Sequence, residues 1–418
     1  MGTKNSEFIR EKIKEKPINK KKLWNKLVVS GLCGIVFAMA FCLVLLLAAP
    51  LLKERLTVAE KETEETQTNL PMDETETEEE NPVVPEEGNV TEDLTIGNYQ
   101  DLQNQLYLIG NTANKSIVSI TKVVNDTDWF NNSYEKESLG SGVIISESTT
   151  KYYILTENKY IKGATQLSVS FYNEDRQEAF VEQVDGNTGL AVLSVVKSGL
   201  SETTLANAKV ATVGNSVSVT RGTLVIALGS PLGTNYSILP GNVTSTNNEI
   251  STEDHNFKIF TTNIVGDEDG SGILINVDGE VIGFVMQDYG QGEGSKTLTA
   301  VAINNLKPII DLMVAGDSVP YLGLQVSTVT DKIEEEYDLP RGVYIKEVTM
   351  DSPAMFAGLQ SGDVITEING TKVSTAVGYS GQLLGLTPGE TYEIKAKRQV
   401  GNGYKEMEFD VEVGVLSN

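Results

Sequence analysis

A serine that could act as a nucleophile lies in the glycine-rich segment GDEDGSG, residues 266–272. Directly after it, ILINVDGEVIGFV places apolar residues on both sides of Asp278-Gly279, which predicts two strands joined by a tight turn. A serine hydroxyl attacks a carbonyl only when a base accepts its proton, most often a histidine oriented by a carboxylate. The chain has one histidine, His255, which lies in the polar segment STEDHNF. That setting favours a surface-loop histidine and leaves Ser271 without an imidazole partner.

The elements around this loop are expected to be short strands. About a dozen runs rich in β-branched residues extend from GSGVIIS (140–146) to LTAVAI (298–303), separated by Gly, Asn, Asp or Thr. Such spacing is typical of an antiparallel sandwich or a pair of barrels. An amphipathic helix is predicted near YQDLQNQLYLIG (99–110), and a short helix at LKPIIDLM (306–313).

Length and composition restrict the class of protein. A chain of 418 residues is expected to form two or more folded units. Its net charge of −25 argues against nucleic acid as a partner. Both cysteines, Cys33 and Cys42, lie in one apolar segment, so the folded part has neither disulfides nor thiolate metal ligands. We expect no metal and no cofactor.

The N-terminal part predicts a membrane anchor. Residues 27–52 contain no charged side chain and are long enough to span a bilayer, with a cleavable signal peptide as the alternative. The lysine-rich tail before it, residues 1–26, is expected to stay in the cytoplasm. Residues 53–97 are strongly acidic and poor in bulky apolar groups, which predicts a disordered spacer between the membrane and the folded part.

A second globular unit is predicted over residues 318–418. Ser352 and Pro353 suit the start of a short helix, and Gly358 suits its end. Asn369-Gly370 favours a hairpin turn, and Ser374 is expected to cap a second helix.

The run SPAMFAGLQSGDVITEING, residues 352–370, resembles the PDZ domains of bacterial secreted and membrane proteases. The resemblance implies that backbone N–H groups of the segment YLGL capture the terminal carboxylate of a peptide, which adds a strand beside them. The residues expected to contact that peptide are Tyr321, Leu322, Gly323, Leu324, Val377 and Leu383, with Leu384 as a further candidate.

The preceding unit resembles the trypsin-like domain of the HtrA/DegP family of serine proteases. Four segments carry the likeness: GSGVIIS (140–146), GLAVLSV (189–195), ALGSPLG (227–233) and ILINVDGEVIG (273–283). The resemblance implies a mainly β structure, with a chymotrypsin-like double β-barrel over residues 98–316 followed by the PDZ domain.

All three catalytic positions of that family are substituted here. The family's histidine segment LTNNHV reads LTENKYI, which places Lys159 at the histidine; the aspartate of DLAVL is Gly189. Counting back from GEVIG, the serine of GNSGG is Gly270. Ser271 is one residue downstream, and a dyad with Lys159 would require a lowered lysine pKa. The carboxylates at 267–269 disfavour a developing oxyanion; calcium binding is one explanation for them, and solvated surface charge is the favoured one.

The substitutions, the PDZ resemblance and the apolar segment 27–52 together predict a membrane-anchored, extracytoplasmic HtrA-like protein that binds protein C-termini or unfolded segments. It would act as a scaffold, a chaperone-like factor or a regulator of an active protease. The alternative is a serine endopeptidase of envelope quality control with an unconventional or weak active site. A third possibility is an oligomeric envelope scaffold, because family relatives often form trimers; a homo-trimer or a hetero-oligomer with an active relative is expected.

Overall fold

The computed structural model describes residues 95–127, 133–290, 296–401 and 403–416. The predicted cytoplasmic tail, the apolar segment 27–52 and nearly all of the acidic spacer lie outside these ranges. Within them, no helix combines the length and the apolar character that crossing a bilayer requires.

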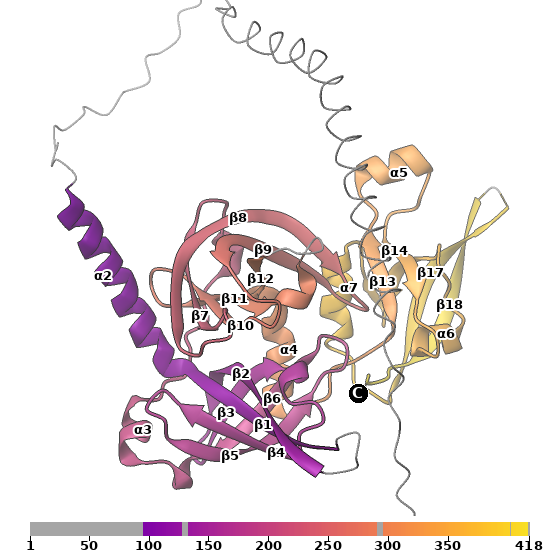
Figure 1. Ribbon diagram of the computed structural model, residues 1–418. Coiled ribbons are helices and arrows are strands. Elements are labelled where there is room, and N and C mark those ends of the chain that lie inside the picture. Colours follow the sequence, from indigo (N-terminus) through magenta and orange to yellow (C-terminus); the bar gives the residue numbers. More distant parts are fainter. Residues whose placement is uncertain (1–94, 128–132, 291–295, 402, 417–418) are drawn as a thin grey trace, which may run out of the picture. The chain divides into compact units, whose positions relative to one another are not determined.

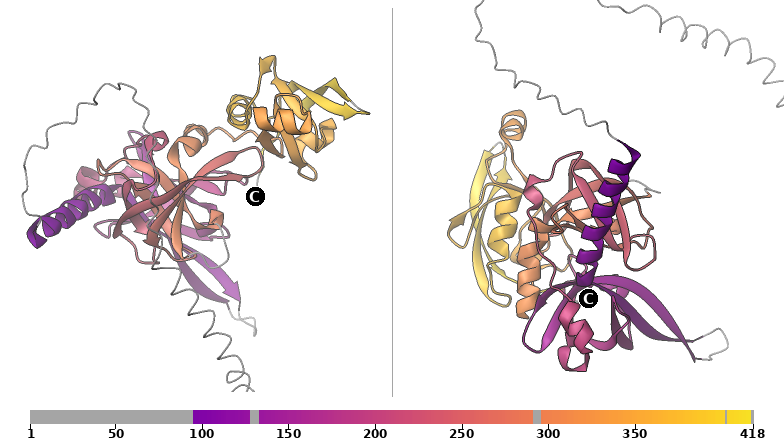
Figure 2. Two further views of the ribbon diagram at one scale, coloured as in Figure 1. Left: turned by 90° about the horizontal axis from the view of Figure 1, so that it is seen from above. Right: turned by 90° about the vertical axis from the view of Figure 1, so that its left-hand side faces the viewer.

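The described part begins with a long helix, α2 (Ile96–Ala113), where an amphipathic helix was predicted. Thr95 and Asn98 form a capping box, with each side chain accepting a hydrogen bond from the other's backbone N–H. Gly110 is buried against Ile238, and a Cβ atom at this position would lie 2.5 Å from the Ile238 side chain. Figure 2 shows α2 from two further sides as one unbroken helix.

Six antiparallel strands close the first barrel in the order β1-β2-β3-β6-β5-β4 (Figure 1). These are β1 (Ile117–Thr127), β2 (Ser133–Glu147), β3 (Lys151–Glu157), β4 (Gln166–Phe171), β5 (Arg176–Val184) and β6 (Leu190–Val196). Short helices flank them: η1 (Asn114–Ser116), η2 (Asn158–Tyr160), η3 (Lys197–Gly199) and α3 (Glu202–Asn207).

The second barrel also has six strands, in the order β10-β11-β12-β9-β8-β7. These are β7 (Leu224–Ser230), β8 (Ser237–Ser251), β9 (Asn256–Val265), β10 (Ser271–Ile275), β11 (Val281–Met286) and β12 (Thr297–Ala302). Helices η4 (Ser216–Ser218), η5 (Gln287–Tyr289) and α4 (Ile303–Ala315) accompany them. The predicted hairpin joins β10 to β11, and Gly279 takes the left-handed conformation that its turn needs, with φ 81°.

One apolar cluster extends across both barrels and includes residues of α2 and α4, and each barrel has a further buried cluster of its own. Buried residues from both barrels, such as Leu155 and Phe257, belong to the same cluster as Leu306 of α4. The prediction of a mainly β, chymotrypsin-like double barrel is confirmed.

The C-terminal unit is a six-stranded antiparallel sheet with three helices. Its strands are β13 (Leu324–Thr328), β14 (Val343–Val348), β15 (Val364–Ile368), β16 (Thr371–Lys372), β17 (Thr391–Val400) and β18 (Gly403–Glu412). Its helices are α5 (Asp331–Tyr337), α6 (Pro353–Ala357) and α7 (Ala376–Leu383). Strand β13 lies at one edge of the sheet, beside β14 only.

The predicted caps of this unit are confirmed except for one. Ser352 caps α6, and Gly358 ends it with φ 91°. The cap of α7 is Thr375 rather than Ser374, so that prediction was wrong by one residue. The Thr375 hydroxyl accepts from the Gly378 N–H, while the Ala376 N–H donates to the Thr328 hydroxyl of β13, a tertiary contact that sets where the helix begins.

A half-buried ion pair holds the end of α6 to the sheet. Arg398 donates two hydrogen bonds of 2.7 Å to Asp363, which is 1% exposed, and a third of 2.8 Å to the Gly358 carbonyl. This bidentate geometry gives the Asp363 carboxylate its charge partner.

We expect Arg398→Leu to lower the free energy of unfolding by about 3 kcal/mol, because it leaves the Asp363 charge buried and unpaired. Urea titration followed by circular dichroism measures the loss. The matched control is Arg341→Leu, which removes an exposed pair with Asp331 and Glu334 and should destabilise the protein clearly less. Equal losses in the two variants would contradict this account of the pair.

Candidate functional site

The structure brings together the three segments that the motifs assign to a catalytic triad. Lys159 lies in η2 directly after β3, Gly189 precedes β6, and Gly270 precedes β10. The Asn158 N–H donates to the Gly189 carbonyl at 2.7 Å, and the Tyr160 hydroxyl donates to the Asp269 carbonyl at 2.9 Å. The chemistry that is possible between these segments therefore depends on the side chains that they carry.

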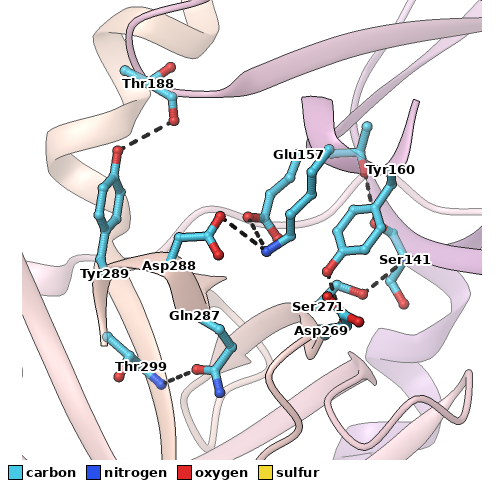
Figure 3. A network of polar contacts seen from close by, with 12 residues as sticks. Ser141, Glu157, Tyr160, Thr188, Asp269, Ser271, Gln287, Asp288, Tyr289 and Thr299 are labelled. Atoms are coloured by element: carbon cyan, nitrogen blue, oxygen red, sulfur yellow. Dashed lines mark hydrogen bonds and ion pairs between the residues drawn. The ribbon is translucent and has the colours of Figure 1, made fainter. Parts of the chain in front are cut away.

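Lys159 is half-buried and pairs with a buried carboxylate. Its ammonium lies 3.0 Å from the Glu157 carboxylate and 3.4 Å from that of Asp288 (Figure 3). The Glu157 side chain is 3% exposed, and this burial raises its pKa to about 7 against the pull of the lysine charge. Burial alone would lower the pKa of Lys159, but the Glu157 charge outweighs it and raises that pKa above its usual value. Lys159 thus keeps its proton at neutral pH and does not suit the role of a general base.

Ser271 is buried in the first position of β10, with 2% of its surface exposed. Its hydroxyl oxygen accepts a hydrogen bond of 3.1 Å from the Ser141 N–H (Figure 3). Among the described residues, no hydrogen bond joins Ser271 to an imidazole, an amine or a carboxylate. The hydroxyl links the two barrels and has no base to accept its proton.

Tyr160 fills the space beside this serine. Its side chain is 6% exposed, and a Cβ atom at Gly140 would lie 2.5 Å from its ring. Figure 3 shows its hydroxyl directed at Asp269 and Ser271. Burial raises the pKa of Tyr160 above its usual value, so the hydroxyl stays protonated at neutral pH.

The loop before β10 leaves no room for a side chain at Gly270. A Cβ atom there would lie 2.7 Å from the Pro231 carbonyl oxygen and 2.9 Å from that of Asp267. The same two carbonyls hold the turn, because the Asp267 N–H donates to Pro231 and the Gly270 N–H donates to Asp267. Gly189 differs: a Cβ would meet nothing within 4 Å, but its φ of 73° disfavours other residues. The acidic residues 267–269 are exposed, as expected of solvated charge, and no group of metal-ligating side chains occurs among the described residues.

The prediction of a surface-loop histidine is wrong. His255 is 2% exposed and stacks on Phe257, with ring centroids 5.5 Å apart. Burial lowers its pKa to about 4, so the imidazole is neutral at pH 7. His255 is the last residue of the β8–β9 turn, which contacts the C-terminal unit, and the polar residues around it in the sequence gave no sign of that contact.

The predicted carboxylate-binding loop does hold a carboxylate, and it belongs to this chain. The backbone N–H groups of Leu322, Gly323 and Leu324 all donate to the side chain of Asp254. The Tyr379 hydroxyl donates to the same carboxylate at 2.6 Å. Sequence reasoning found the loop but missed Asp254 and Tyr379, because no motif marks either residue.

The other predicted peptide-binding residues differ in their exposure. Val377 on α7 is 70% exposed, whereas Leu383 is fully buried in the core of the unit and presents no surface. Tyr321 is 5% exposed, and its hydroxyl donates to Glu253 at 2.6 Å. Leu384 is half-buried.

The raised pKa of Glu157 predicts a pH dependence of stability. The folded protein keeps this proton up to about pH 7, whereas the ordinary value for the unfolded chain is 4.5. The contribution to stability is therefore complete below pH 4.5 and is lost as the pH rises through 7. When the pH rises from 5 to 8, the wild type should lose about 3 kcal/mol of unfolding free energy through this carboxyl. Glu157→Gln has no carboxyl at this position and should not show that loss.

Urea titrations at each pH measure this difference, with Glu268→Gln as the control because Glu268 is exposed. That control should follow the wild type throughout. A Glu157→Gln profile parallel to the wild type would show that Glu157 is ionised in the folded protein at pH 5.

Comparisons with known proteins agree with this architecture. A family model described as a trypsin-like peptidase domain matches residues 140–284, and one described as a PDZ domain matches residues 320–413. The serine protease Do-like HtrB of Bacillus subtilis (strain 168) is 31% identical over 255 residues, 56% of this chain and 54% of that protein. The serine protease Do-like HtrA of Lactobacillus helveticus is 30% identical over 285 residues, 64% of this chain and 67% of that protein.

A solved structure, the HtrA-type protease AlgW with decapeptide, shares the fold. It matches with a TM-score of 0.54 and 23% identity, over 75% of this chain and 99% of that one. The chain spans about half the length of the first curated relatives that it matches. The domain order, the two closed barrels and these identities place the chain in the HtrA family of trypsin-like serine proteases with a PDZ domain.

Proposed function

We propose that this chain is a membrane-anchored, extracytoplasmic member of the HtrA family that binds polypeptide C-termini and does not hydrolyse peptide bonds. The observation that carries the proposal is the ion pair of Lys159 with the buried Glu157, at the position where the family motif has its histidine. A protonated ammonium held by two carboxylates cannot accept the proton of an attacking hydroxyl.

Two further observations support the loss of hydrolysis. Ser271 is buried, and its oxygen already accepts a hydrogen bond from the Ser141 backbone. Gly270, at the serine position of the motif, lies in a turn with no space for a side chain. An acyl-transfer mechanism needs nucleophile, base and oxyanion donors in one geometry, and these contacts argue against such an arrangement here.

The PDZ domain supports the binding activity. Its loop of three N–H groups holds a carboxylate in this structure, which is the ligand that such a loop takes from a peptide terminus. AlgW, which shares the fold, was solved with a decapeptide. We extend peptide binding to this chain as part of the proposal.

The place of action is proposed from relatives and from the N-terminal sequence. Two similar proteins, from Halomonas elongata and Marinomonas sp., are named probable periplasmic serine endoproteases. Residues 27–52 would anchor the chain with its N-terminus in the cytoplasm, and residues 53–97 would link the anchor to the folded part. Association with itself or with an active relative would let the bound peptide influence proteolysis in trans.

The first test is hydrolysis of unfolded casein by the full chain. We expect no turnover above buffer, and no change on Ser271→Ala. The restored triple variant Lys159→His, Gly189→Asp, Gly270→Ser should also stay inactive, because the side chain at position 270 meets the Pro231 and Asp267 carbonyls. Wild-type cleavage that disappears in Ser271→Ala would establish the endopeptidase alternative.

The second test concerns the PDZ loop. A peptide selected from a library of free C-termini should lose at least about tenfold in affinity when its terminus is amidated, since three N–H groups lose their charged acceptor. Gly323→Ala should have a similar effect, because a Cβ atom there would lie 2.4 Å from Ser352 at a φ of 80°.

The control is Gly370→Ala, a glycine of similar φ at which an added Cβ atom would meet nothing within 4 Å. It should leave the affinity for the peptide unchanged. A selected peptide that binds equally well with an amidated terminus would contradict recognition of C-termini by this loop.

A further inference from the structure

The carboxylate in the PDZ loop has the contacts of a bound ligand. Oδ2 of Asp254 accepts from the Leu322 N–H at 2.7 Å and from the Gly323 N–H at 2.8 Å, and Oδ1 accepts from the Leu324 N–H at 3.1 Å. With the 2.6 Å bond from Tyr379, the carboxylate accepts four hydrogen bonds. Asp254 is fully buried, although it belongs to the β8–β9 turn of the second barrel.

The backbone of Asp254 also pairs with the edge of the PDZ sheet. Its N–H donates to the Leu324 carbonyl at 2.7 Å, and its own carbonyl accepts from the Ser380 hydroxyl on α7 at 2.7 Å. The residue thus presents a carboxylate next to a backbone N–H, the two groups that the last residue of a peptide would present. A peptide that adds a strand to β13 needs the same loop donors and the same strand edge.

Neighbouring residues of the turn occupy more of that edge. Ser251 donates to the Val326 carbonyl at 3.2 Å, and Asn256 donates to the same oxygen at 3.4 Å. The Glu253 carboxylate accepts from Tyr321, whose backbone begins the loop. The segment from 251 to 256 therefore covers the loop and the first carbonyls of β13 together.

The conformation of the turn explains how an internal residue reaches the loop. Asp254 has φ 61°, in the left-handed region, and Thr252 closes the turn by donating its N–H to the His255 carbonyl at 2.9 Å. The buried ring of His255 stacks on Phe257 and holds the base of the turn. These contacts direct the Asp254 side chain at the PDZ loop.

We infer that Asp254 is a built-in ligand of the PDZ domain, and that a peptide C-terminus binds only after the turn 252–255 has left the loop. The inference rests on the proposed binding of C-termini and adds its regulation. The affinity measured for any peptide is then the intrinsic affinity multiplied by the fraction of open molecules. Peptide binding would also release the second barrel from the PDZ domain, since one site cannot hold both carboxylates.

The test compares peptide binding by the full-length wild type and by Asp254→Asn in detergent. The probe is a fluorescent pool of random decapeptides with free carboxyl termini, and the same pool with amidated termini is the blank. Replacing the carboxylate by an amide sets an NH2 group against the loop donors, so the closed state should weaken. We expect anisotropy to report at least about a tenfold tighter apparent Kd for the free-carboxyl pool in Asp254→Asn.

Two further variants test whether tighter binding in Asp254→Asn comes from the lost contact with the PDZ loop. Tyr379→Phe removes one donor to Asp254 and should tighten binding in the same direction by a smaller factor. Asp267→Asn removes an exposed carboxylate and should bind as the wild type does. Equal Kd values for the wild type, Asp254→Asn and Tyr379→Phe would overturn the inference while leaving C-terminal binding in place.

Amide hydrogen exchange separates the inference from the proposed function. Without any peptide, the fragment covering 321–325 should exchange faster in Asp254→Asn than in the wild type, whereas a fragment covering 364–368 should not change. Unchanged exchange at 321–325 would overturn the inference. Faster exchange with no binding of either pool by any variant would overturn the proposed function and leave the internal contact established.

Discussion

The ion pair between Lys159 and Glu157 determines which charges and protons are held at the centre of the trypsin-like domain. A buried carboxylate is costly unless a charge or hydrogen-bond donors accompany it, so Glu157 and Lys159 depend on each other for their place between the barrels. Asp288, in η5 directly after β11, is the second carboxylate near the Lys159 ammonium. A side chain that must neutralise a buried partner cannot also take up a proton during a reaction. In this structure Lys159 therefore acts as the charge partner of the buried Glu157.

The buried carboxylate of Asp254 also needs partners that compensate its charge. No lysine or arginine contacts Asp254 among the described residues, and its charge is met by three backbone N–H groups and a tyrosine hydroxyl. Burial raises its pKa to about 6 while these donors act in the opposite direction, so it is ionised at neutral pH. One carboxylate thus joins the PDZ domain to the second barrel, and the other fills the centre of the trypsin-like domain.

Much of the fold could be predicted from local sequence signals. The β-branched runs, the turn at Asp278-Gly279 and the helix start at Ser352-Pro353 depend on neighbours in the sequence, and the structure confirms each of them. The hairpin after Ser271 also places that serine at the start of β10, because register counts residues from a fixed turn.

The contacts between distant segments could not be predicted. Asp254 lies 68 to 125 residues from its donors, and Asp288 lies 129 residues from Lys159. For His255, polar neighbours suggested exposure, yet the turn that carries it packs under another unit. The Ser374–Thr375 ambiguity has the same origin: both hydroxyls suit a cap, and the contact of Ala376 with Thr328 decides between them.

The contacts of Ser271 and Lys159 predict a trypsin-like domain without an activated nucleophile. Labelling with a serine-reactive fluorophosphonate, followed by mass spectrometry of the intact chain, tests it without any assumption about substrate. We expect an unmodified mass after prolonged exposure, because the Ser271 hydroxyl is buried and no base contacts it among the residues that the structure describes. A single phosphonate adduct that disappears in Ser271→Ala would contradict it.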